Sequence, residues 1–173
     1  MKITLSSLIL LLLSFYGFAQ TIKTTSFEIT FPAQPQEAEQ DIVTEAGDTH
    51  IKTYQLMHEG AMLLMTEAAY PEGVNLTANM EVNKKILKNS KNGSVNNFAG
   101  QMGLPVTLVS EIFEEYKTLL ALRSVDKVGN YYAQVFTLLH KNKLYAMMVF
   151  SETELQGRTL LYQLTDSFQL LTL

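Results

Sequence analysis

A hairpin whose strands are apolar on both faces constrains the fold of this chain more than any other feature. It is YYAQVFTLLHKNKLYAMMVF, residues 131–150, with a polar turn at its centre. Asparagine tolerates a positive φ, so we expect Asn142 to help form the turn. Successive strand residues point to opposite faces, which puts Tyr145 and Met147 on one face and Met148 on the other. Strands apolar on both faces are usually central, so we expect both faces to be covered.

Alternation of apolar and polar residues predicts further strands before and after a polar middle segment. The alternation is clear in SFEITF, where Phe27, Ile29 and Phe31 share one face, and it continues through AMLLMTEAAY and PVTLVSEIF. The polar residues 36–45 fit an edge strand. Each of these segments is short and bounded by Gly, Pro, Asn or Asp, as strands of an antiparallel sheet usually are.

Two segments show helical spacing instead. Residues 77–99 are polar with sparse apolar positions, and Thr77 is the expected N-cap. Gly93 inside this pattern costs about 1 kcal/mol relative to alanine, so one helix and two shorter ones both remain open. Near the C-terminus, Ser151 and Glu154 match a capping box, and an apolar face follows it. The sequence therefore predicts an α+β domain, with an antiparallel sheet of about six to eight strands and two main helices.

The first nineteen residues have the layout of a secretory signal peptide. MKITLSSLILLLLSFYGFA has one basic residue, an apolar run and small residues near its end. This pattern predicts cleavage after Ala19 and one domain over residues 20–173. A transmembrane anchor is the alternative, but it needs about twenty unbroken apolar residues, and this run is shorter. We therefore expect an exported protein, periplasmic or secreted, without a stable membrane anchor.

Charge and cysteine content exclude several classes of partner and chemistry. The chain has 13 basic and 17 acidic residues and no cysteine. An acidic surface argues against nucleic acid, whose phosphates select basic patches, and against docking on anionic lipid. Without cysteine there is neither a disulfide nor an acylated lipoprotein anchor.

The order of the motifs resembles a known family. The segments FEITFPAQPQ, YPEGV, ILKNSKNGSVNNFAG, YYAQVFTLLHKNKLYAMMVF and TDSFQLL span nearly all of residues 20–173. In this order they resemble small exported bacterial domains with the PsbP-like α+β fold, named after an extrinsic subunit of photosystem II. Related sequences often carry a Gly-Pro-Gly hairpin where this chain has FEEYKTLL, residues 113–120. The resemblance implies a non-enzymatic accessory role.

No catalytic or metal-binding motif is visible. His50, His58 and His140 are not spaced as zinc ligands are, and the chain has no nucleophile elbow, Walker loop or calcium loop. Adjacent Glu114 and Glu115 would point to opposite faces of a strand. We therefore predict no catalytic residue, no cofactor and no metal.

The functional hypotheses follow from this lack of chemistry. The first is a non-enzymatic binding or accessory domain of the bacterial cell envelope, with an unknown protein or a small apolar ligand as its partner. The second is a carrier of a small apolar ligand in a methionine-rich groove, and the third is an uncharacterised enzyme. The candidate face is formed by Tyr145, Met147, Met148, Met62 and Met65. The same methionines also fit a role as core filler, and both readings stay open at this point.

Overall fold

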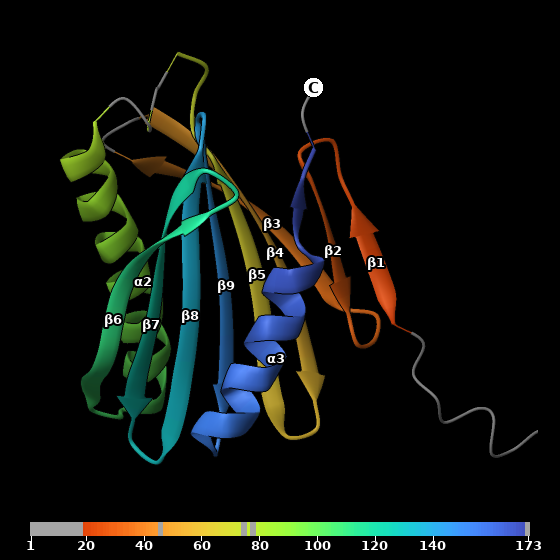
Figure 1. Ribbon diagram of the computed structural model, residues 1–173, viewed down its shortest axis with the longest axis vertical. Coiled ribbons are helices and arrows are strands. Elements are labelled where there is room, and N and C mark those ends of the chain that lie inside the picture. The colour runs from red at the N-terminus through yellow and green to blue at the C-terminus, as the bar shows by residue number, and fades with distance from the viewer. Residues whose placement is uncertain (1–18, 45–46, 74–75, 77–78, 172–173) are drawn as a thin grey trace, which may run out of the picture.

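The computed structural model describes residues 19–44, 47–73, 76 and 79–171 (Figure 1). The predicted signal peptide lies outside the described residues except for Ala19. The chain forms, in order, β1 (Gln20–Lys23), β2 (Phe27–Phe31), β3 (Gln36–Thr44), β4 (Gly47–His58), β5 (Ala61–Ala69), α2 (Met80–Met102), β6 (Val106–Tyr116), β7 (Leu119–Val128), β8 (Tyr131–His140), β9 (Lys143–Ser151), α3 (Glu154–Ser167) and β10 (Gln169–Leu170).

Seven antiparallel strands form the main sheet, in the order β3-β4-β5-β9-β8-β7-β6. Two meanders, β3–β5 and β6–β9, each pair strands that follow one another along the chain. They join where β5 lies beside β9, with Met65 opposite Met147. The predicted antiparallel sheet is confirmed, and its seven strands fall in the predicted range.

A second, three-stranded sheet was not predicted. It has the order β1-β2-β10, so strands from near both ends of the described chain pair with β2. It packs with α3 against one face of the main sheet (Figure 1). Phe27, Ile29 and Phe31 of β2 are completely buried there, as their alternation predicted.

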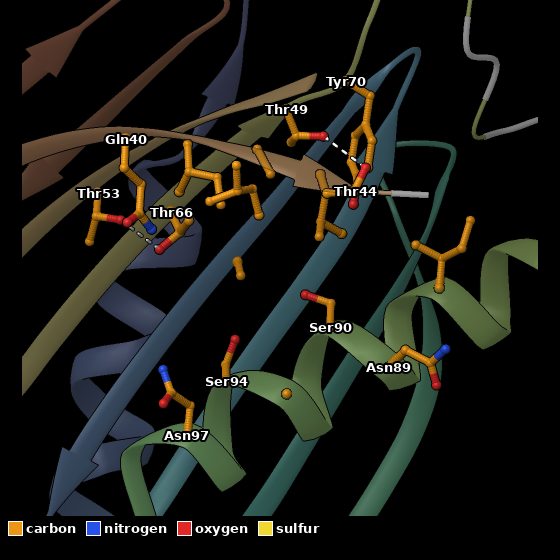
Figure 2. A pocket seen from close by; sticks show the side chains of 17 residues that line it. Gln40, Thr44, Thr49, Thr53, Thr66, Tyr70, Asn89, Ser90, Ser94 and Asn97 are labelled. Atoms are coloured by element: carbon orange, nitrogen blue, oxygen red, sulfur yellow. Dashed lines mark hydrogen bonds between the residues drawn. The ribbon is translucent and has the colours of Figure 1, made fainter. Parts of the chain in front are cut away.

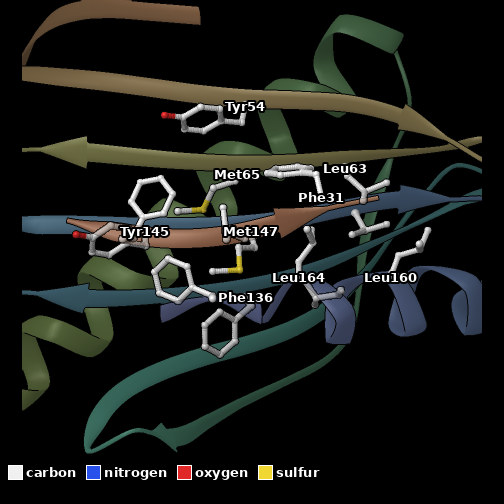
Figure 3. Close-up of a cluster of buried hydrophobic side chains, with 14 of the residues drawn as sticks. Phe31, Tyr54, Leu63, Met65, Phe136, Tyr145, Met147, Leu160 and Leu164 are labelled. Atoms are coloured by element: carbon white, nitrogen blue, oxygen red, sulfur yellow. The ribbon is translucent and has the colours of Figure 1, made fainter. Parts of the chain in front are cut away.

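The main core fills the space between this small sheet, α3 and the main sheet (Figure 3). Met65, Met147 and Tyr145 lie within it, and each is at most 1% exposed. Met148 and Phe150 point to the opposite face and pack in a second cluster with Val95 and Ala99 of α2. Most residues on both faces of β9 are thus buried, as its composition predicted.

Helix α2 covers only part of the other face. It packs on β6, β7 and β8 and leaves β3, β4 and β5 beside it rather than beneath it (Figure 1). It runs unbroken through Gly93, which resolves the question that the sequence left open. Asn79 is its N-cap and accepts from the Glu81 and Val82 amides, so the predicted cap at Thr77 is wrong.

The predicted cap of α3 is wrong, whereas the predicted turn at Lys141-Asn142 is confirmed with a different residue at positive φ. Thr153, not Ser151, caps α3, because its hydroxyl accepts from the Gln156 amide while Ser151 bonds the Thr153 carbonyl. In the hairpin turn between β8 and β9, Lys141 rather than Asn142 takes the positive φ, at 56°. The Asn142 amide instead donates to the Tyr70 carbonyl at 2.7 Å and ties this turn to the end of β5.

The tight turn at residues 113–120 forms without glycine. Lys117 and Thr118 both adopt positive φ, 48° and 72°, as a two-residue type I′ hairpin requires. Lys117 Nζ and the Tyr116 hydroxyl each donate to the Phe168 carbonyl at 2.9 Å. The end of α3 therefore holds the turn in a conformation that these residues disfavour on their own.

Candidate functional site

A groove lies where α2 stops covering the sheet, and we call it the α2 groove (Figure 2). Its floor is formed by β3, β4, β5 and β9, and α2 is one wall. Its volume is about 640 Å³. The lining residues are Gln40, Ile42, Thr44, Thr49, Ile51, Thr53, Thr66, Ala68, Tyr70, Ile86, Asn89, Ser90, Gly93, Ser94, Asn97, Leu144 and Ala146.

No Asp, Glu, Lys, Arg or His is among the described residues that line the groove. Threonines come from the sheet and Ser90, Ser94 and Asn97 from the helix, and the two sets face one another across the space (Figure 2). Thr53 and Thr66 share a hydrogen bond of 3.4 Å on the floor. Hydroxyl and amide groups both donate and accept, so the lining offers hydrogen bonds without fixed charge.

A smaller hollow continues the groove toward the C-terminal end of α2. It measures about 310 Å³ and shares Thr53, Thr66, Ser94 and Asn97 with the larger space. The remaining lining residues are mainly apolar or amide-bearing: Gln55, Met62, Leu64, Phe98, Gln101 and Met148. The hollow adds two methionines and an aromatic ring to the lining, beside further amide groups.

Helix α2 is a firm wall because ion pairs and aromatic stacking fix it to the sheet. Lys91, 3% exposed, places Nζ 3.2 Å from Asp126 and 3.6 Å from Glu111. The Ser124 hydroxyl donates to the second oxygen of Asp126 at 3.1 Å. Further along, Phe98 stacks on Phe150 with ring centroids 3.6 Å apart.

The five residues of the predicted face do not form one surface. Tyr145, Met147 and Met65 are buried in the main core, and Tyr145 also lines a pit of about 110 Å³ at its border. Met62 and Met148 lie on the opposite face and line the smaller hollow. The structure thus separates the set into core methionines and groove methionines.

Tyr145 also touches the main polar cluster outside the groove. Its hydroxyl lies near Glu67, which accepts 2.7 Å from the Ser26 hydroxyl and 2.5 Å from Lys143. Burial, with the Glu67 charge, raises the pKa of Tyr145. An adjoining pit of about 110 Å³ is lined partly by His140 and Lys141. Because Glu67 is already bonded twice, we assign this cluster a structural role: it ties the β1–β2 connection to the main sheet.

The histidines are spread over the surface of the fold. His50 Nδ1 lies 2.8 Å from Asp41 and belongs to the exposed face of β3 and β4. Burial and the neighbouring Lys141 lower the pKa of His140. In the part of the chain that the structure describes, no three His, Asp or Glu side chains are grouped as metal ligands.

Comparison with known proteins identifies the fold. The solution structure of cyanobacterial PsbP (CyanoP) from Synechocystis sp. PCC 6803 aligns with a TM-score of 0.58 and 13% identity, covering 88% of this chain and 92% of that one. The fold is PsbP-like. A Pseudomonas aeruginosa protein of unknown function, PA94, described as a putative regulator, aligns with a TM-score of 0.37 and 7% identity over 85% of this chain and 95% of that one. No protein-family model matches the chain, and no curated protein matches its sequence.

The motif order of the sequence predicted the PsbP-like fold of this chain. It did not predict the α2 groove. In the sequence its residues stand out only as small polar side chains, Ser90, Ser94 and Asn97, along one side of α2 and as threonines on one face of β4 and β5. None of the helices in the described ranges is long and apolar enough to cross a bilayer.

Proposed function

We propose that this chain is an exported, non-enzymatic binding domain of the bacterial cell envelope, with the α2 groove as its binding site. The observation that carries the proposal is a space of about 640 Å³ lined by hydroxyl, amide and aliphatic groups without a charged side chain. This volume lies within the range of small-molecule sites, about 300–1,000 Å³. The lining has hydroxyl groups but no Asp, Glu, Lys or His to activate them, which favours binding over catalysis.

The lining predicts the chemistry of the ligand. A buried charge without a partner costs several kcal/mol, so a groove without counter-charges favours uncharged ligand groups. The threonines and amides suit groups that donate and accept hydrogen bonds, whereas Ile42, Ile51 and Leu144 suit apolar ones. We therefore propose an uncharged ligand with mixed polar and apolar character.

A carrier of a small apolar ligand is the second candidate. The hollow of about 310 Å³ next to Met62, Leu64, Phe98 and Met148 favours it, because flexible thioethers adapt to apolar guests. This candidate predicts that substituting Met62 and Met148 weakens binding more than substituting Ser90 and Asn97 does.

Two glycines of α2 offer a matched pair for the test. Gly93 lines the groove and Gly100 does not, and an added Cβ would meet no heavy atom within 4 Å at either position. Gly93→Leu should place a side chain inside the groove and obstruct part of it, while Gly100→Leu makes the same change to the same helix outside it. Leucine is a better helix former than glycine, so both variants should fold.

The binding probe is the neutral fluorophore N-phenyl-1-naphthylamine, with the anionic 8-anilinonaphthalene-1-sulfonate for comparison. We expect fluorescence enhancement with the neutral probe, at least about tenfold weaker binding in Gly93→Leu, and unchanged binding in Gly100→Leu. Failure of the parent protein to bind, equal loss in both variants, or preference for the anion would contradict the proposal. N-terminal sequencing of the protein secreted from a Gram-negative host tests export, with Gln20 as the expected first residue.

A further inference from the structure

The free edge of the main sheet lies beside the α2 groove. β3 ends the sheet, and β4 is its one strand partner among the described residues. The pairing runs without interruption from Gln36 to Thr44, and every residue of the strand but Thr44 is exposed. Over the exposed residues 36–43, at about 3.3 Å per residue, this edge offers a regular row of backbone donors and acceptors about 26 Å long.

The opposite edge differs in regularity. In β6 the register shifts between Leu108 and Ser110, which leaves Val109 in a bulge. A bulge bends the strand and breaks the even spacing that a new partner would need. β3 therefore presents the more regular template for an added strand.

The two faces of β3 differ in charge. Gln40, Ile42 and Thr44 line the uncharged groove. On the other face, Glu37, Glu39 and Asp41 form an acidic row; Glu39 and Asp41 are 49% and 81% exposed. Hydrogen bonding to Lys52 lowers the pKa of Glu39, so this carboxylate is ionised at neutral pH.

The acidic row keeps a negative charge after its internal pairing. Lys52 Nζ contacts Glu37 and lies 2.7 Å from Glu39, and His50 Nδ1 lies 2.8 Å from Asp41. Three carboxylates thus share one lysine and one imidazole. Pairing of β3 with β3 of a second copy would bring like charges together, which disfavours self-association through this edge.

We infer that the outer edge of β3 accepts an extended segment of a partner protein in which lysine or arginine alternates with uncharged residues. Alternate side chains of an added strand point to opposite faces. One set therefore meets the acidic row, while the other set enters the α2 groove. Main-chain hydrogen bonds along β3 supply affinity, and the two faces supply specificity. The inference rests on the proposed function, because it names the uncharged groups that the groove would receive.

The test uses a fluorescein-labelled nine-residue peptide in which lysine alternates with threonine and valine, titrated with the purified protein by fluorescence anisotropy. We expect saturable binding, and no binding of the same peptide with glutamate in place of lysine. Two further versions carry N-methyl groups on the odd or on the even residues. Strand addition requires one methylated version to bind and the other to fail, because one edge of the peptide faces β3. Equal binding of both would overturn the inference.

Two protein variants locate the site. The triple change Glu37→Gln, Glu39→Gln and Asp41→Asn should weaken peptide binding at least about fivefold, whereas Glu115→Gln on β6 should not. Unchanged binding in the triple variant, with its fold confirmed by thermal unfolding, would contradict the inference. Binding of the neutral probe and of the peptide, each measured on the parent protein and on Gly93→Leu, separates the two proposals. If the neutral probe fails to bind while the peptide binds with register dependence, the edge site stands and the proposed groove fails. If the probe binds and the peptide does not, the proposed groove stands and the edge site fails.

Discussion

Lys91 allows a quantitative test of how α2 is fixed to the sheet. Its ammonium is 3% exposed, 3.2 Å from Asp126 and 3.6 Å from Glu111. At an effective dielectric constant of about 20, the two contacts correspond to about 5 kcal/mol of attraction each, most of which offsets the desolvation of buried charges. Removing one partner leaves the other charge buried, so we expect Lys91→Met to lower the free energy of unfolding by about 3–5 kcal/mol.

Lys88 is the matched control, because it also contacts Glu111 from α2 but is 47% exposed. Lys88→Met should cost at most about 1 kcal/mol, as exposed ion pairs do. The double variant Lys91→Met/Asp126→Leu removes both buried charges and should recover most of the loss. Urea unfolding followed by circular dichroism measures all three. If Lys91→Met costs no more than Lys88→Met, the buried pair does not anchor the helix as argued.

Four further changes test individual features. Thr137→Val should raise the free energy of unfolding by about 1 kcal/mol, because the Thr137 hydroxyl is buried without a partner among the described residues; a loss in urea unfolding would show that it is bonded. Gly93→Ala should add about 0.5–1 kcal/mol by helix propensity, and an unchanged urea midpoint would argue against it. Thr118→Gly should add about 1 kcal/mol, since a β-branched residue at φ 72° is strained, and a lower melting temperature would contradict this. NMR titration should give His140 a pKa below its ordinary value of 6.5. The unfolded chain then binds the proton more readily than the folded one, so the free energy of unfolding should fall as the pH drops through about 6.5. A free energy of unfolding that does not change with pH in this window would count against the prediction.

The sequence predicted the strands that carry the core, because each shows either clear alternation or a continuous apolar run over five or more residues. Phe27, Ile29 and Phe31 are one example, and the two apolar faces of β9 are another. It did not predict β1 or β10, since strands of four and two residues hold too few positions to establish a period. The cap of α3 was misplaced by two residues because Ser151-x-x-Glu154 and Thr153-x-x-Gln156 both match a capping box, and the sequence alone does not rank them.

The α2 groove was beyond sequence reasoning for a different physical reason. Thr53, Thr66 and Ser94 are of types common on any solvent-facing strand or helix, so their presence does not mark a site. The groove exists because α2 sits over β6–β8, and that offset depends on buried Lys91 and on Phe98 stacked against Phe150. Met62 and Met65 are three residues apart on one predicted strand, so strand alternation alone already places them on opposite faces, as the structure has them.

The junction between the two meanders has a consequence for how the nascent chain behaves on the ribosome. β5 cannot meet β9 until about eighty further residues have been synthesised, and β2 waits longer still for β10. Contacts between such distant segments form slowly, because a long loop must close first. The complete main sheet and its core therefore form only after nearly the whole polypeptide has been synthesised.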